Sequence, residues 1–185
     1  MALSATIYHA SLDIADSDRN FYGHERLTLA LHPSETAERM VARLLAWCLF
    51  NDQLDPPLTF GSGISTPNEP DLWRRDLLDN VQHWIDVGEP DADRVRKACL
   101  RSKRVTVLPY GRAWAQWWKR HEKDISRMER ADVIALPWQE VGTLATALPR
   151  TFTWQVNTSD GALYIVDHRG EMTTLHPDVI KPFAG

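Results

Sequence analysis

Two aspartates in or beside apolar segments are the residues of this chain whose type and spacing could do chemistry. Asp71 follows Pro70, and Asp86 lies 15 positions further on, inside the apolar run 84–87. A carboxylate in a buried strand costs several kcal/mol in desolvation unless it is paired, hydrogen-bonded or bound to a cation. Carboxylate oxygens that meet at a strand end are ligands that Mg²⁺ prefers. The sequence therefore predicts a divalent-metal site that includes Asp71 and Asp86.

Glu38 is the predicted third metal ligand. It shares a helical face with Val41 and Leu45, because these positions are separated by steps of three and four. Each of the three acids also has a structural alternative. Glu38 could lie in solvent at the rim of its face, Asp71 could begin a helix, and Asp86 could cap the turn that follows its strand.

Lys97 is the first lysine beyond these acids, in a predicted helix over 91–102. It projects to the side of that helix opposite Val95, where a solvated basic face is the common outcome. The same window is rich in basic residues: Arg94, Arg96, Lys97, Arg101, Lys103 and Arg104. Such a strip could also bind phosphate groups, although Asp91 and Asp93 partly neutralise it.

The elements that must position these residues follow from hydrophobic periodicity and from turn residues. We expect two strands, over 7–14 and 27–31, that are joined as a hairpin. A helix with Ser34 as its N-cap is expected over 34–50, and a Pro- and Gly-rich loop over 51–70. Strands are then expected over 84–87, 105–108 and 133–136, and they alternate with helices over 91–102, 112–128 and 138–147. Three further strands are expected over 151–156, 163–166 and 171–175.

This order of elements predicts an α/β fold. Strands that alternate with helices favour parallel neighbours joined by right-handed crossovers. We expect a central mixed β-sheet flanked by helices, with a small antiparallel part at the C-terminal end. No linker-like segment divides the chain, so residues 1–185 are predicted to form a single domain.

Composition narrows the class of protein. The 185 residues are 43% hydrophobic and 25% charged, with a net charge of −4, which is typical of a soluble globular protein and argues against indiscriminate binding of nucleic acid. Cys48 and Cys99 lie in apolar helical patterns and indicate a reducing compartment. The sequence has neither a signal-like start nor an apolar run of about 20 residues, so we expect a cytoplasmic protein without a membrane span. Gly-x-Ser-x-Gly, Cys-x-x-Cys, His-Glu-x-x-His and phosphate-loop motifs are also missing from the sequence.

Three segments of the chain, 1–8, 32–40 and 84–90, resemble the bacterial YaeQ family. The resemblance covers essentially the whole sequence. It implies a cytoplasmic bacterial protein whose fold is a variation of the PD-(D/E)XK nuclease fold, which is also called restriction-endonuclease-like. The family's biological role is poorly defined, so the resemblance implies a fold more firmly than an activity.

The wider nuclease pattern can be placed on this sequence position by position. It implies that Glu38 is the acid of the first core helix, Asp71 the acid of the Pro-Asp element, and Asp86 the acid of the next strand. The lysine of the pattern is expected at position 88, which is Gly88, so the resemblance leaves Lys97 as the candidate.

The function that the resemblance implies is a Mg²⁺-dependent nuclease that acts on nucleic acid phosphodiesters. Glu38, Asp71 and Asp86 would hold the metal, and Lys97 would orient the attacking water. Two alternatives stay open. One is a non-catalytic regulatory protein that binds nucleic acid or protein on a degenerate nuclease scaffold, and the other is a small-molecule phosphohydrolase.

Overall fold

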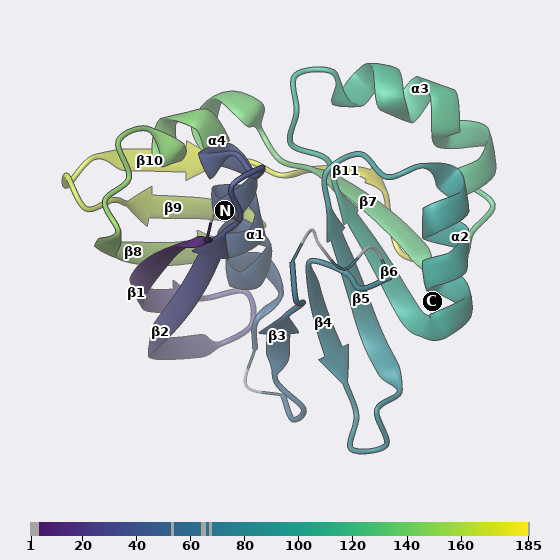
Figure 1. Ribbon diagram of the computed structural model, residues 1–185, viewed down its shortest axis with the longest axis horizontal. Coiled ribbons are helices and arrows are strands. Elements are labelled where there is room, and N and C mark those ends of the chain that lie inside the picture. Colours follow the sequence, from purple (N-terminus) through teal and green to yellow (C-terminus); the bar gives the residue numbers. More distant parts are fainter. Residues whose placement is uncertain (1–3, 53, 64–65, 67, 185) are drawn as a thin grey trace.

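Two mixed β-sheets with a helix between them organise the molecule (Figure 1). The computed structural model describes residues 4–52, 54–63, 66 and 68–184. The helices are α1 Ala37–Phe50, α2 Ala92–Arg101, α3 Trp114–Ile125 and α4 Trp138–Ala145. The strands are β1 Thr6–Asp16, β2 Phe21–Leu31, β3 Leu58–Phe60, β4 Leu72–Arg75, β5 Val81–Val87, β6 Ser102–Leu108, β7 Ala131–Ala135, β8 Thr151–Ser159, β9 Ala162–Val166, β10 Met172–Leu175 and β11 Asp178–Lys181.

The first sheet, which we call the terminal sheet, has the strand order β10-β9-β8-β1-β2. The predicted N-terminal hairpin is present, with β1 antiparallel to β2. The C-terminal strands pair antiparallel as expected, β8 with β9 and β9 with β10. They do not form a separate small part, however, because β8 pairs in parallel with β1 and extends the hairpin into a five-stranded sheet. Alternate residues of β8, such as Trp154 and Val156, are buried, so this strand has an apolar face that must pack against the shared core.

Helix α1 packs between the two sheets and is buried on nearly all sides. Its residues 40–48 are all buried, which is the pattern of a helix inside a core and not of a surface helix. The helix begins later than the sequence predicts. Thr36 is the N-cap, with its side chain accepting a hydrogen bond of 3.2 Å from the Arg39 amide, whereas the Ser34 hydroxyl bonds to His32 instead.

The second sheet, which we call the central sheet, has the strand order β11-β7-β6-β5-β4-β3. Strands β5, β6 and β7 are parallel, which confirms the prediction of parallel neighbours. Helices α2 and α3 cover one face of this sheet, where Trp84 and Val95 belong to a separate hydrophobic cluster. The opposite face packs on α1 through residues such as Ile85.

Three local features of the central sheet correct or complete the sequence predictions. The 51–70 segment contains the short strand β3, and residue 71 is followed by strand β4, so Asp71 does not begin a helix. The edge strand β11 was not predicted from the sequence. Across the described ranges, no helix combines the length and the apolar character that a membrane span requires.

Candidate functional site

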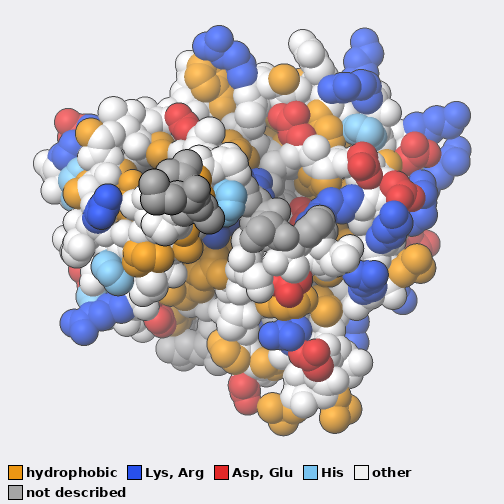
Figure 2. All heavy atoms as spheres, viewed as in Figure 1, with side chains coloured by type: hydrophobic (Ala, Val, Ile, Leu, Met, Phe, Trp, Pro, Cys, Tyr) orange, Lys and Arg blue, Asp and Glu red, His pale blue; other side chains and the backbone are white. Residues whose placement is uncertain are grey.

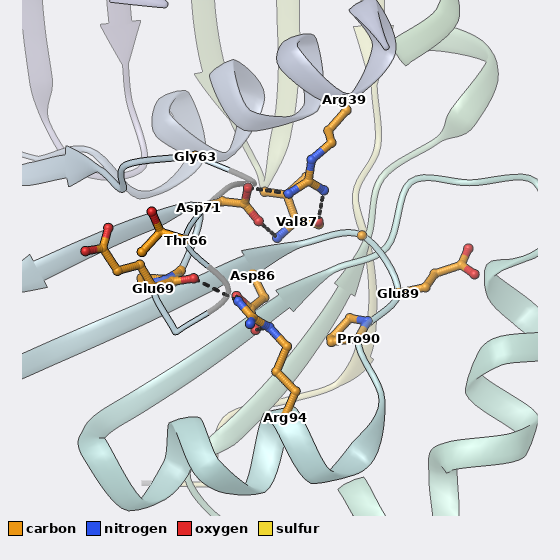
Figure 3. Close-up of a pocket in the computed structure, with 12 residues that line it drawn as sticks. Arg39, Gly63, Thr66, Glu69, Asp71, Asp86, Val87, Glu89, Pro90 and Arg94 are labelled. Carbon is orange, nitrogen blue, oxygen red and sulfur yellow. Dashed lines mark hydrogen bonds and ion pairs between the residues drawn. The ribbon is translucent and has the colours of Figure 1, made fainter. Parts of the chain in front are cut away.

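Asp71 and Asp86 lie side by side because β4 and β5 are antiparallel neighbours. Leu72 is opposite Ile85 in the register, and the Asp71 amide donates a 3.0 Å hydrogen bond to the Ile85 carbonyl. The start of β4 therefore meets the end of β5, which brings the two acids together from positions 15 residues apart. Both aspartates are buried, and both line one pocket of about 340 Å³ (Figure 3).

Asp71 is held by the main chain of β5 and by Arg39 of α1. Its Oδ2 accepts a 2.7 Å hydrogen bond from the Val87 amide, and its Oδ1 accepts one of 2.5 Å from Arg39. The same guanidinium donates to the Val87 carbonyl at 2.5 Å. The Arg39 guanidinium thus joins two oxygens of different kinds, a carboxylate and a main-chain carbonyl, at the end of β5.

Asp86 forms a bidentate ion pair with Arg94 of α2. Arg94 donates from Nε to Oδ2 at 2.9 Å and from Nη2 to Oδ1 at 2.7 Å, and it also bonds to the Glu69 carbonyl. Asp91 caps α2 by accepting a 2.8 Å hydrogen bond from the Arg94 amide, which fixes the turn that carries the arginine. Burial raises the pKa of Asp86 above its usual range, although Arg94 opposes that shift.

Two more acids line the pocket without adding a carboxylate to the central pair. In Figure 3 the side chains of Glu69 and Glu89 point away from Asp86. The Glu69 carboxylate instead accepts a 2.9 Å hydrogen bond from the Ser62 amide, and this contact lowers its pKa. No cluster of three or more His, Cys, Asp and Glu side chains able to hold a metal ion occurs among the described residues.

The other two predicted site residues lie elsewhere. Glu38 is exposed on α1 and does not line the pocket. Lys97 is 69% exposed, and its Nζ pairs with Asp93 at 2.8 Å. Lys97 lines a neighbouring pocket instead, which shares Arg94 with the first. The structure therefore brings together Asp71 and Asp86, but it places neither Glu38 nor Lys97 beside them.

Gly88, where the nuclease pattern expects a lysine, has a local reason to be glycine. Its φ is +116°, a backbone conformation that residues with a side chain rarely adopt. A Cβ at this position would stand 3.4 Å from Nη1 of Arg39 and 3.9 Å from the Tyr110 ring. The positive charge beside position 88 therefore comes from α1, through Arg39.

The sequence did not indicate Arg39 as a site residue, and it indicated Arg94 only as part of a basic strip, not as the partner of Asp86. For Arg94 a signal existed, because Pro90-Asp91 opens the helix and places residue 94 in its first turn, one short loop beyond Asp86. For Arg39 the sequence offers no comparable signal, since its partner Asp71 is 32 residues away. Only the packing of α1 on the central sheet brings those two together.

Comparison with known proteins assigns the chain to a family without assigning it an activity. The model of the YaeQ protein family matches residues 1–175. The chain is 39% identical over 173 residues to the YaeQ protein of Salmonella typhi and 36% identical to that of Escherichia coli K12, covering 93% of this chain and 94% of each relative. Both relatives are uncharacterized proteins.

Solved structures extend this agreement to the whole fold. The crystal structure of the YaeQ protein from Xanthomonas axonopodis pv. citri superposes with a TM-score of 0.90 at 42% identity, covering 96% of this chain and 99% of that one. The YaeQ protein from Pseudomonas syringae gives the same TM-score at 35% identity, covering 98% of each chain. The chain therefore belongs to the YaeQ family.

Proposed function

We propose that the pocket at the end of β5 binds a divalent cation such as Mg²⁺ and serves a nuclease-like hydrolysis of nucleic acid phosphodiesters. The observation that carries this proposal is the convergence of two buried aspartates, Asp71 and Asp86, on one open pocket. We also infer that the central sheet with α1 and α2 corresponds to the core of the PD-(D/E)XK fold. In support, the Pro-Asp element precedes β4 and the second acid lies in the next strand, β5.

The oxygen atoms in the pocket are of the kind that a hard divalent cation prefers as ligands. Mg²⁺ is commonly held by one or two carboxylates, with waters and phosphate oxygens completing its coordination. Asp71, Asp86 and the carbonyl of Val87 are oxygen donors of this type at one strand end. The raised pKa of Asp86 indicates that Arg94 does not fully offset the burial of that carboxylate, so further positive charge in the pocket would stabilise its ionised form.

The two arginines have a definite role in this proposal. Arg39 and Arg94 keep the aspartates oriented toward the pocket, and both guanidinium groups line it. A bound Mg²⁺ would polarise a phosphate and lower the pKa of a coordinated water. Arginine side chains that turn from carboxylate to phosphate can bind it through two parallel hydrogen bonds and offset the charge of the transition state. Arg39 and Arg94 then supply the charge that the sequence led us to expect from Lys97.

The test combines cation binding with cleavage. Purified protein is titrated with Mg²⁺ and Mn²⁺ by calorimetry, and single- and double-stranded DNA and RNA are incubated with each metal. We expect saturable binding and cleavage in the unmodified protein, and loss of both in Asp71→Asn and Asp86→Asn. Asp132→Asn is the matched control, because Asp132 is an equally buried, arginine-paired aspartate outside the pocket.

Variants of the basic residues separate the two possible sources of positive charge. If Arg39 and Arg94 supply it, Lys97→Met keeps its cleavage rate when substrate is saturating, and Arg94→Lys loses it. A loss of that rate in Lys97→Met would instead restore Lys97 as the water-orienting group. Protein that neither binds a divalent cation nor cuts any of the nucleic acids would overturn the proposal.

A second candidate function is a non-catalytic scaffold that binds nucleic acid or protein. The observation in its favour is that both aspartates already have a guanidinium partner and that Lys97 pairs with Asp93. The same titration decides between the two. Binding of nucleic acid without any cation binding or cleavage would favour the scaffold.

A further inference from the structure

We propose that the basic face of α2 binds the phosphate backbone of a polymeric nucleic acid and leads it into the pocket. The residues of this basic face are Arg94, Lys97 and Arg101. They are separated by steps of three and four, which places them on one side of the helix. The inference rests on the proposed function only in the identity of the pocket that the polymer reaches.

The basic face begins at the candidate site. Arg94 lines the pocket at the end of β5, and it also lines a second pocket of about 270 Å³ together with Lys97 and Arg101. From residue 94 to residue 101 the helix rises about 10 Å, which corresponds to about three phosphate steps along one strand of B-DNA. The two pockets therefore follow one another along α2 on the scale of a nucleic acid backbone.

Two charges on this face, those of Lys97 and Arg101, can be recruited by a polyanion at little cost. Lys97 is 69% exposed, its partner Asp93 is 58% exposed, and Arg101 is exposed as well. Exposed ion pairs contribute little to stability, so Lys97 can exchange its carboxylate for a phosphate. Asp91, which also lines the second pocket, has its carboxylate on the Arg94 amide at the start of the helix. Figure 2 shows Lys and Arg side chains interspersed with acidic ones over the right-hand part of the molecule, where α2 lies in Figure 1.

A second phosphate-binding stretch beside the pocket distinguishes between classes of substrate. A small phosphate ester fills only the pocket of about 340 Å³, whereas a polymer also reaches the face of α2. Because each phosphate contact releases counterions, affinity should increase with the length of the oligonucleotide and decrease with salt concentration. The structure thus favours a polymeric phosphodiester over a nucleotide or another small ester.

The experiment measures binding of fluorescent oligonucleotides in EDTA, so that neither a metal ion nor cleavage contributes. The probes are single-stranded DNA ranging from a dinucleotide to about a dozen nucleotides, and a duplex of about a dozen base pairs. For the double variant Lys97→Gln/Arg101→Gln we expect the Kd at low salt to increase at least about tenfold, and the slope of log Kd against log salt to fall by about 2. The dinucleotide should bind weakly to both proteins.

The matched control is Arg96→Gln/Lys103→Gln, which removes the same charge from exposed positions outside both pockets. It should change Kd less than about twofold. Equal losses in the two double variants, or no binding of any oligonucleotide, would overturn the inference. The proposed function has a separate readout, because hydrolysis of the small diester bis(p-nitrophenyl) phosphate with Mn²⁺ depends on the pocket alone. An unmodified protein that hydrolyses this diester but binds no oligonucleotide would refute the role of α2 and leave the pocket intact.

Discussion

Two aspartate–arginine pairs on the central sheet have nearly the same geometry but very different surroundings. In the first, Arg94 contacts Asp86 at 2.9 and 2.7 Å, and in the second, Arg104 contacts Asp132 at 3.0 and 2.9 Å. The aspartate side chains are each 3% exposed, and the arginines are 31% and 34% exposed. Judged by distance and burial alone, the two pairs cannot be told apart.

The groups around the two ion pairs differ. Asp132 also accepts hydrogen bonds from the buried Thr106 hydroxyl, which in turn bonds to His83 at 2.8 Å. This closed network lies on the face of the sheet toward α1, and its polar groups bond to one another. Asp86 lies on the other face, next to an open pocket and a second aspartate. A buried ion pair therefore indicates a candidate site only where an open pocket and a second buried acid, which would be stabilised by further positive charge, lie beside it.

Asp132→Asn should give the largest loss of stability. The substitution takes the counter-charge from Arg104 and also disturbs the hydrogen bonds between the carboxylate and the buried Thr106 hydroxyl, and together these losses should cost about 3 kcal/mol. Urea unfolding followed by circular dichroism measures the change. A loss below about 1 kcal/mol would mean that water already solvates this pair and that the network is not closed.

His83, in the same closed network, should make stability depend on pH. Burial, aided by Arg104 and Arg74, lowers the pKa of His83 from 6.5 to about 3. The folded protein keeps the imidazole neutral while the unfolded chain takes up a proton below about pH 6.5, so stability falls as pH decreases toward 3, by roughly 1.4 kcal/mol per pH unit. Between pH 7 and pH 5 the unmodified protein should lose about 2 kcal/mol more than His83→Gln in urea unfolding. Equal losses in the two proteins would show that water reaches the imidazole.

Asp86→Asn should cost less stability than Asp132→Asn, about 1 kcal/mol, because water in the open pocket can solvate the released Arg94. If the pocket binds a divalent cation as proposed, the larger effect of this variant should be the loss of the stabilisation by Mn²⁺ in thermal unfolding. The comparison between the two pairs would fail if Asp86→Asn were the more destabilising variant. It would also fail if Asp132→Asn lost the Mn²⁺ effect.

Asp93→Asn should have the smallest effect on stability. Asp93 pairs with Arg96 at 2.9 Å and with Lys97 at 2.8 Å, but all three side chains are exposed. Water and salt screen such pairs, so we expect no measurable change in the thermal midpoint. If α2 binds phosphate, the same variant should bind oligonucleotides more tightly, since it frees Lys97. A marked loss of stability would show that these exposed charges hold the helix in place.

The local elements could be predicted from the sequence because they depend on residues close together in the chain. The alternating strand and helix patterns from 84 to 136 correctly indicated the parallel strands β5, β6 and β7. The start of α1 was misplaced by two residues, since both Ser34 and Thr36 can cap a helix and only the backbone conformation selects between them. The assignment of β8 to the sheet of β1 was not predictable, because strand pairing joins residues more than a hundred positions apart.

The same distinction between local sequence and tertiary packing applies to the candidate site. By itself the sequence determined the family, and it identified the two aspartates, because an acid in or beside an apolar strand is visible in a few neighbouring residues. Only the tertiary structure decided that Asp71 and Asp86 share a pocket, that Arg39 and Arg94 face them, and that Lys97 lies outside. The physical reason is that hydrophobic periodicity reports which face of an element is buried, whereas the partner on that face depends on how distant elements pack.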